Sequence, residues 1–153
     1  MDAERHLIRR ITAEEVRTLR HRVLRPGQSF EETVYPGDEA GVHLGAFDDD
    51  NRLVGIASLY REDRPGGPPG GWRLRGMATA DDVRGHGYGS ALLAASIAHA
   101  DAEGGTELWC NARLPAAGFY RRAGFDVVSE EFEIAGIGPH MVMTRRGSMD
   151  LRP

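Results

Sequence analysis

The chain has 153 residues, of which 41% are hydrophobic, enough to fill the core of one compact domain. Its formal net charge of −4 argues against a protein that wraps nucleic acid, because such binding relies on many phosphate contacts from a basic face. No stretch approaches the ~20 apolar residues of a membrane span, and the single cysteine, Cys110, excludes an internal disulfide and fits a reducing compartment. We expect one domain over residues 1–153, located in the cytoplasm, with no membrane or nucleic-acid partner.

The basic residues are all arginines, and six of them fall in the central part of the chain: Arg73, Arg75, Arg84, Arg113, Arg121 and Arg122. Arginine binds phosphate well because its planar guanidinium carries several donors in a fixed geometry. A genomic codon bias would give the same composition. The arginines therefore indicate either an anionic ligand near this segment or only the codon bias.

The first third of the chain predicts a strand, a helix and a hairpin. Residues 6–11 form a candidate strand, and Thr12 with Glu15 resembles a capping box that opens a helix to about Leu24, ended by Pro26-Gly27. Residues 28–38 have no clear periodicity, which predicts a loop or a short helix. Two apolar runs then flank the turn 48–51, which predicts a β-hairpin.

The rest of the chain alternates strands with helices. We expect strands at 72–79, 107–112, 125–133 and 140–144, and helices from about Gly89 to Gly104-Gly105 and over 115–122. The Pro- and Gly-rich segment 64–71 is typical of a surface loop. This order predicts an α/β (α+β) fold with a mixed sheet.

A glycine-rich loop carries the strongest chemical signal. After the strand that ends near Thr79, the segment Arg84-Gly85-His86-Gly87-Tyr88-Gly89-Ser90 leads straight into an apolar helix. Glycines allow close approach of the backbone to a ligand, and the first amides of a helix have no internal partner, so a pyrophosphate can bind there. A tight turn would also use glycine, but three glycines in five residues exceed what a turn requires.

Three known kinds of phosphate-binding loop combine glycines with the start of a helix, as this segment does. A Walker A loop requires a lysine, and the chain contains none. A dinucleotide fingerprint that starts at Gly85 places Ser90 where the third glycine belongs, and no second βαβ half is evident. The pattern Arg/Gln-x-x-Gly-x-Gly/Ala is satisfied in full by Arg84, Gly87 and Gly89.

This loop resembles the CoA-binding loop of the GNAT acetyltransferases. The resemblance extends nearly continuously from Trp72 to Thr144 and includes Ala116-Ala117-Gly118-Phe119-Tyr120-Arg121-Arg122-Ala123-Gly124-Phe125. The segments Leu74-Arg75-Gly76-Met77-Ala78, Trp109-Cys110-Asn111-Ala112-Arg113 and Gly138-Pro139-His140 resemble a subgroup of small GNAT proteins. The resemblance to this family implies a mostly antiparallel central sheet flanked by helices, with a splayed strand pair that holds CoA.

The resemblance also implies roles for individual residues. Acetyl-CoA would be the co-substrate, with no metal, and a small-molecule amine the acceptor; a homodimer is left open. The residues expected at the cofactor are Met77, Thr79, Arg84, Gly85, His86, Gly87, Tyr88, Gly89, Ser90 and Asn111.

Two residues are candidates for catalysis. Tyr120 falls where the family often places a hydroxyl that protonates the departing thiolate, although a core aromatic next to Phe119 and Phe125 is the alternative. His140 begins a strand and could act as a base, or it could simply bond a carbonyl at a strand end. Cys110 alternates with apolar neighbours, which favours a buried small side chain over an acyl-carrying nucleophile.

Two departures from the family pattern bear on mechanism. Arg113 replaces an asparagine that often contacts the pantetheine, and residues 72–77 contain no glutamate that could serve as the usual base. The base could then be water linked to His140 or to an N-terminal carboxylate. The acidic run of Glu31, Glu32, Asp38 and Glu39 is typical of a solvated face, and the alternative is that one of its carboxylates attracts a cationic amine. The expected function is N-acetyltransfer to an amine by direct transfer, and the alternative is a non-catalytic acyl-CoA sensor.

Overall fold

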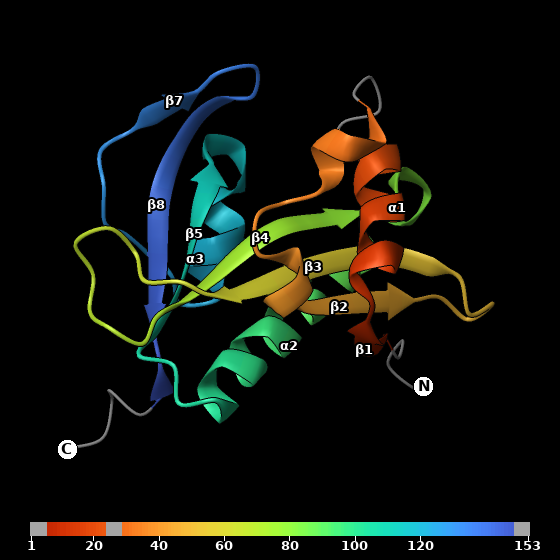
Figure 1. Ribbon diagram of the computed structural model, residues 1–153, viewed down its shortest axis with the longest axis horizontal. Helices are drawn as coiled ribbons and strands as arrows, with labels where there is room; N and C mark the ends of the chain where they lie inside the picture. Colours follow the sequence, from red (N-terminus) through yellow and green to blue (C-terminus); the bar gives the residue numbers. More distant parts are fainter. Residues whose placement is uncertain (1–5, 24–28, 149–153) are drawn as a thin grey trace. The chain divides into compact units, whose positions relative to one another are not determined.

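The computed structural model describes residues 6–23 and 29–148. The chain divides into two compact units, and Figure 1 labels its helices and strands. The first unit comprises Met1–Tyr60 and Gly76–Ser96, and the second comprises Arg61–Arg75 and Ile97–Pro153. The helices and strands are β1 (Leu7–Ile11), α1 (Ala13–Val23), β2 (Val42–Phe47), β3 (Leu53–Arg61), β4 (Trp72–Thr79), α2 (Tyr88–Ala102), β5 (Glu107–Arg113), α3 (Ala117–Arg122), β6 (Asp126–Val127), β7 (Phe132–Ile134) and β8 (Gly138–Arg146). Short 3-10 turns are η1 (Phe30–Thr33), η2 (Asp38–Ala40), η3 (Asp81–Val83) and η4 (Leu114–Ala116).

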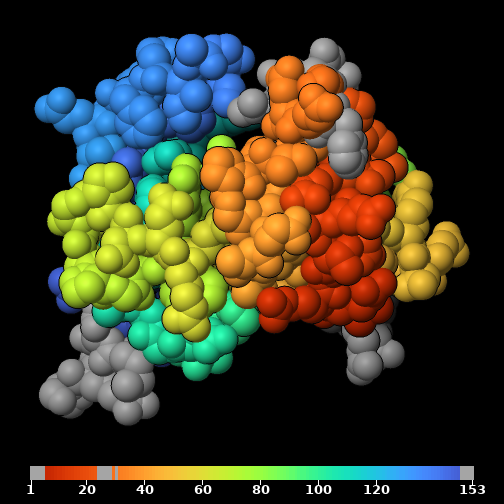
Figure 2. Space-filling model, viewed as in Figure 1, coloured from red at the N-terminus to blue at the C-terminus, as the bar shows by residue number. Residues whose placement is uncertain are grey.

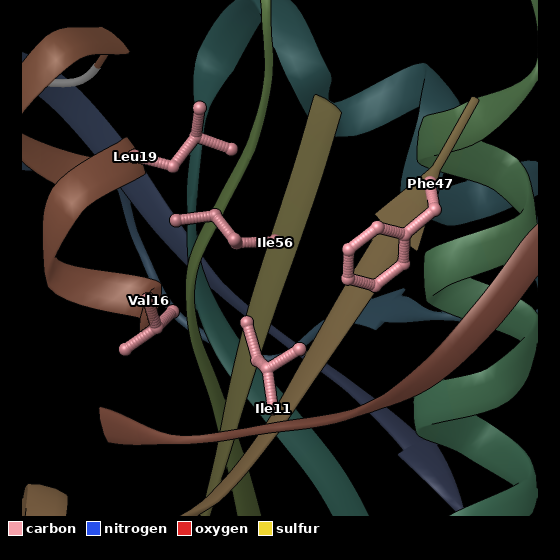
Figure 3. Packing of buried hydrophobic residues seen from close by; sticks show 5 residues of the cluster. All are labelled: Ile11, Val16, Leu19, Phe47 and Ile56. Atoms are coloured by element: carbon pink, nitrogen blue, oxygen red, sulfur yellow. The ribbon is translucent and has the colours of Figure 1, made fainter. Parts of the chain in front are cut away.

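The first unit is built on the antiparallel strands β1, β2 and β3. Helix α1 contributes two apolar side chains to a core cluster that the strands complete (Figure 3). Its members are Ile11, Val16, Leu19, Phe47 and Ile56, all at most 6% exposed. The spacing of Val16 and Leu19 places both on one face of α1, so burial of that face fixes the helix on the strands.

The start of α1 confirms the predicted capping box. The Glu15 amide donates to Thr12 Oγ1 at 3.1 Å, and the Thr12 amide donates to Glu15 Oε1 at 3.1 Å. Each side chain therefore satisfies a backbone donor that the helix leaves open. The predicted end of the helix near Leu24, Pro26 and Gly27 lies outside the described residues.

The hairpin between β2 and β3 is also confirmed. Asp48 Oδ1 accepts hydrogen bonds from the amides of Asp50 and Arg52, at 3.0 and 2.9 Å, and the Asp48 amide donates to the Arg52 carbonyl. Asn51 has a φ of +60°, a left-handed conformation that asparagine tolerates better than most residues. The turn chemistry of residues 48–51 therefore sets where the chain reverses.

The second unit combines the start of β4 with β5, β8, β6 and β7. Strand β4 pairs in parallel with β5 at Trp72↔Leu108 and Arg73↔Trp109. The antiparallel β5–β8 ladder is long, running from Glu107↔Arg146 to Arg113↔His140. Antiparallel ladders with one parallel pair and flanking helices confirm the predicted mixed α/β sheet.

One expected strand is interrupted. The sequence predicted a continuous strand over 125–133, but the structure divides this segment into β6 and β7. The partners on β8 advance three positions, from Met143 to His140, while this chain advances five, from Val127 to Phe132. The extra residues are not part of the ladder with β8. Ser129 Oγ accepts a hydrogen bond from the Val142 amide at 2.9 Å, in place of a backbone carbonyl.

The Pro- and Gly-rich connection between β3 and β4 lies on the surface, as its composition predicted (Figure 2). Most residues from 65 to 70 are exposed. Gly66 and Gly70 have φ of +77° and +88°, which other residues rarely adopt.

Candidate functional site

The connection from β4 to α2 is a tight, exposed turn within the first unit. The His86 amide donates to the Val83 carbonyl at 3.2 Å and closes the turn. Gly85 and Gly87 have φ of +84° and +85°, in the left-handed region. Their conformation is the physical reason for glycine at these two positions.

The amides at the start of α2 lie where an anion can be bound. Helix α2 begins at Tyr88, and the Ala91 amide donates a hydrogen bond to the Gly87 carbonyl at 3.1 Å. Gly89 and Ser90 come before this first helical hydrogen bond, so their amides have no carbonyl acceptor within the helix. The helix dipole adds a positive potential at this end. Because the His86 amide serves the turn, the amides suited to an anion are those from Gly87 onward.

The side chains of the loop differ in exposure. Arg84 is exposed and pairs with Asp81 Oδ1 at 2.9 Å, a surface contact that an anionic ligand can replace at little cost. Tyr88, the first residue of α2, is buried. His86 has an exposed side chain, so its contribution to the loop comes from its backbone.

Met77 and Thr79 occupy the part of β4 that belongs to the first unit, and both are half-buried. Gly76 has a φ of +67°, which interrupts the regular extended backbone just before Met77. A break of this kind is what a bulged strand requires.

Tyr120 lies in the second unit, in an apolar setting on α3. Its ring makes edge contacts with Phe119 at 5.2 Å and Phe125 at 5.4 Å between centroids. Burial, together with the hydrogen bond that its hydroxyl makes to the Cys110 thiol, raises the pKa of Tyr120. Burial also raises the pKa of Cys110 to about 12. Both groups are protonated at neutral pH, so Tyr120 can donate a proton and Cys110 is a poor nucleophile.

His140 is buried at the start of β8, in the second unit. Its Nδ1 lies 2.8 Å from the Gly138 carbonyl oxygen, and its ring stacks on Phe132 at 5.9 Å. Since a carbonyl only accepts, Nδ1 carries the proton, and the lone pair of the neutral ring is on Nε2. The carbonyl bond expected for a strand-end histidine is therefore present, and it leaves His140 in the tautomer that a base requires.

Asn111 is half-buried on β5, opposite Val142 of β8. The described β4–β5 ladder ends after Arg73↔Trp109, so Asn111 lies beyond the part of β5 that pairs with β4. Its neighbour Arg113 is exposed and faces His140 in the register with β8.

A buried polar cluster in the first unit was missed by the sequence analysis. The Arg20 guanidinium binds Asp38 through two contacts of 2.8 and 3.1 Å, and it also donates to the Thr33 carbonyl, Ser58 Oγ and Tyr60 Oη. Burial alone would raise the pKa of Asp38, but the hydrogen bonds from Arg20, Tyr60 and the Tyr35 amide outweigh it and hold that pKa at about 2. Asp38 is thus a buried, paired carboxylate.

The cluster corrects the interpretation of the acidic run. Glu31, Glu32 and Glu39 are exposed, as expected of a solvated face, but the same interpretation is wrong for Asp38. Its charge is neutralised by Arg20, so it is not free to attract a cationic amine. The helical spacing of Arg20 with Val16 and Leu19, on the buried face of α1, is the signal that could have revealed the pair.

His43 completes this cluster as a neutral ring. Its Nε2 lies 2.9 Å from the Asp38 carbonyl oxygen, and its Nδ1 lies 2.7 Å from Ser58 Oγ. Burial lowers the pKa of His43. Nε2 therefore donates and Nδ1 accepts, which ties β2 and β3 to η2.

No group of three or more His, Cys, Asp or Glu side chains among residues 6–23 and 29–148 is arranged to hold a metal ion. None of the helices in these ranges is long and apolar enough to cross a membrane.

Comparisons with known proteins agree on one family. The model of an acetyltransferase (GNAT) domain matches residues 7–145. YitI of Bacillus subtilis (strain 168), described as an uncharacterized N-acetyltransferase, is 40% identical over 140 residues, covering 89% of this chain and 93% of YitI.

Solved structures show the same fold at low sequence identity. Escherichia coli ElaA superimposes with a TM-score of 0.75 at 18% identity, covering 93% of this chain and all of ElaA. A GNAT superfamily phosphinothricin acetyltransferase from Sinorhizobium meliloti, solved with AcCoA, gives a TM-score of 0.73 at 16% identity, covering 94% of this chain and 91% of that one.

Proposed function

The chain belongs to the GNAT acetyltransferase family, and from this premise we propose that it transfers an acetyl group from acetyl-CoA to an amine. The observation that carries the proposal is the loop from Arg84 to Ser90, with its left-handed glycines and the open amides at the start of α2. The match of the family model to residues 7–145 supports treating residues 1–153 as one functional domain.

The loop would bind the pyrophosphate of CoA. The amides of Gly87, Gly89 and Ser90 donate to phosphate oxygens, and the α2 dipole adds to the attraction. Arg84 exchanges Asp81 for a phosphate. Met77 and Thr79 of β4 and Asn111 of β5 are assigned to the pantetheine arm.

Transfer would proceed directly, without an acyl-enzyme. A neutral amine attacks the thioester carbonyl carbon, and the oxygen becomes an oxyanion that the Met77 amide stabilises. As the C–S bond breaks, Tyr120 donates its proton to the departing CoA sulfur. The raised pKa of Cys110 supports this route over one with an acylated cysteine.

A base must remove the proton of the amine. We assign this role to His140, acting through water, because its Nδ1 is held by the Gly138 carbonyl and its lone pair is on Nε2. The pairing of Asp38 with Arg20 removes one competing carboxylate from consideration.

The acceptor would be a small-molecule amine. The phosphinothricin acetyltransferase from Sinorhizobium meliloti is named for a small-molecule substrate, which supports this assignment by analogy. The net charge of −4 does not favour nucleic acid as a partner. We place the reaction in the cytoplasm.

The proposal is tested by thiol release. The protein is incubated with acetyl-CoA and a panel of amines, amino acids, polyamines and peptides, and free CoA is measured above background hydrolysis. At least one amine should give CoA release together with its acetylated product. Binding of acetyl-CoA without transfer to any amine would instead support an acyl-CoA sensor.

A further inference from the structure

His6 reaches the glycine-rich loop from the segment just before β1. Its Nε2 lies 2.5 Å from the His86 carbonyl oxygen, a contact between residues 80 positions apart in the chain. Its ring also meets the ring of Tyr88 at 4.6 Å between centroids, almost perpendicular to it. All three residues belong to the first unit.

The His6 contact fixes the direction of an amide. A carbonyl oxygen only accepts hydrogen bonds, so Nε2 of His6 carries the proton and donates it to His86. The peptide unit that contains the His86 carbonyl also contains the Gly87 amide. In a planar trans peptide the C=O and the N–H point in opposite directions. A donor that holds the carbonyl on one side therefore turns the Gly87 amide to the other side.

Gly87 is shaped to receive the imidazole. A Cβ on Gly87 would lie 3.2 Å from Cε1 and 3.3 Å from Nε2 of His6, closer than ordinary contact. The backbone of His86 is held at its other end as well, because its amide donates to the Val83 carbonyl. Both polar backbone groups of His86 thus have partners on the protein, and the carbonyl contact orients the peptide unit that carries the Gly87 amide.

We propose that His6 is a positioning residue of the CoA loop, holding the His86 carbonyl so that the Gly87 amide points at the pyrophosphate. This inference rests on the proposed function. The His6 ring needs no contact with the ligand, and its effect is on the affinity for CoA and not on the chemical step.

The test separates the donor from the ring. His6→Phe keeps an aromatic ring beside Tyr88 but cannot donate, whereas His6→Gln places an amide donor near the position of Nε2. Leu7→Ala, an exposed change at the next residue, is the control. Calorimetric titration with CoA should show about fivefold weaker binding for His6→Phe, the effect of one hydrogen bond. His6→Gln and Leu7→Ala should bind CoA as the wild type does.

Kinetics with acetyl-CoA give a second readout. His6→Phe should raise KM for acetyl-CoA and leave kcat unchanged, a split that a general loss of stability does not produce. If His6→Phe does not fold, as judged by its melting curve, His6→Leu replaces it as the variant without a donor.

The outcomes distinguish this inference from the function beneath it. Wild-type affinity in a folded variant without a donor would overturn the role of His6 and leave the CoA loop intact. Equal weakening in His6→Phe and His6→Gln would also overturn it, since the donor would then be irrelevant. Failure of the wild-type protein to bind CoA would remove the proposed function, and the role of His6 with it.

Discussion

The loop from Arg84 to Ser90 and the surroundings of Tyr120 hold their polar groups in opposite ways. The loop is mostly exposed, and its amides point outward from a helix start. The Tyr120 ring packs against Phe119 and Phe125, and its hydroxyl interacts with the Cys110 thiol. Open donors can bind an anion in the ground state, whereas one enclosed proton donor contributes mainly when charge develops on the reacting atom. Binding and turnover should therefore respond to different substitutions.

Tyr120→Phe should give the largest effect. The ring contacts are kept and the proton donor is lost, so kcat should fall by ~10² to 10⁴-fold, the usual range for general-acid catalysis, while the Kd for acetyl-CoA stays the same. CoA release is followed at saturating acetyl-CoA with an acceptor from the amine panel, and a melting curve confirms folding. A folded variant with kcat within about twofold of wild type would leave water as the proton source.

Gly87→Glu should affect CoA binding by the loop from Arg84 to Ser90. The added side chain would start against the His6 ring and carry a carboxylate into the loop, so CoA binding should weaken by at least ~100-fold because the carboxylate repels the pyrophosphate. Gly87→Ala is the matched control: it carries the same backbone strain at φ +85° without the charge, so it should bind CoA more tightly than Gly87→Glu. Equal CoA affinity of a folded Gly87→Glu variant and the wild type, by calorimetry, would refute the loop assignment.

Acid should reduce the stability that the buried Arg20–Asp38 pair contributes. This pair lies outside the proposed CoA loop and the surroundings of Tyr120. The folded pKa of Asp38, about 2, lies below its ordinary value of 3.8. The resulting stability is present above pH 3.8 and is lost as the pH falls toward 2. The loss amounts to about 2 kcal/mol of the unfolding free energy.

Urea unfolding across this pH range measures the effect. Asp38→Asn is the control, because its amide does not titrate, so the acid-dependent loss should be smaller in this variant. The same loss in both proteins would show that other carboxylates cause it.

Cys110→Ala should give the smallest effect on turnover. The thiol is buried and its pKa is raised to about 12, so it cannot carry the acetyl group readily. We expect kcat within about threefold of wild type and no labelling of the native protein by iodoacetamide. Loss of turnover in a folded variant would argue for a covalent route through Cys110.

Local features of the sequence predicted much of the fold. The capping box of Thr12 and Glu15, the turn at 48–51 and the boundaries of β4 follow from neighbouring residues, and the structure reproduces them. The loop was found for the same reason, since its glycines and its arginine lie within six residues of one another.

What the sequence did not reveal depends on contacts between distant residues. Arg20 and Asp38 are 18 positions apart, and His6 and His86 are 80 apart, so no local pattern links them. The interruption between β6 and β7 depends on the register with β8, which the sequence of residues 125–133 does not contain. Individual roles at the candidate site, such as the base, depend in the same way on groups brought together by folding.

Titration of CoA into the wild-type protein by calorimetry tests whether the loop from Arg84 to Ser90 belongs to a CoA site. We expect one site per chain with a micromolar-class Kd, about 8 kcal/mol of binding free energy at 1 μM. Absence of binding at millimolar CoA, in a protein shown to be folded by its melting curve, would contradict the assignment of the loop from Arg84 to Ser90 as the CoA site.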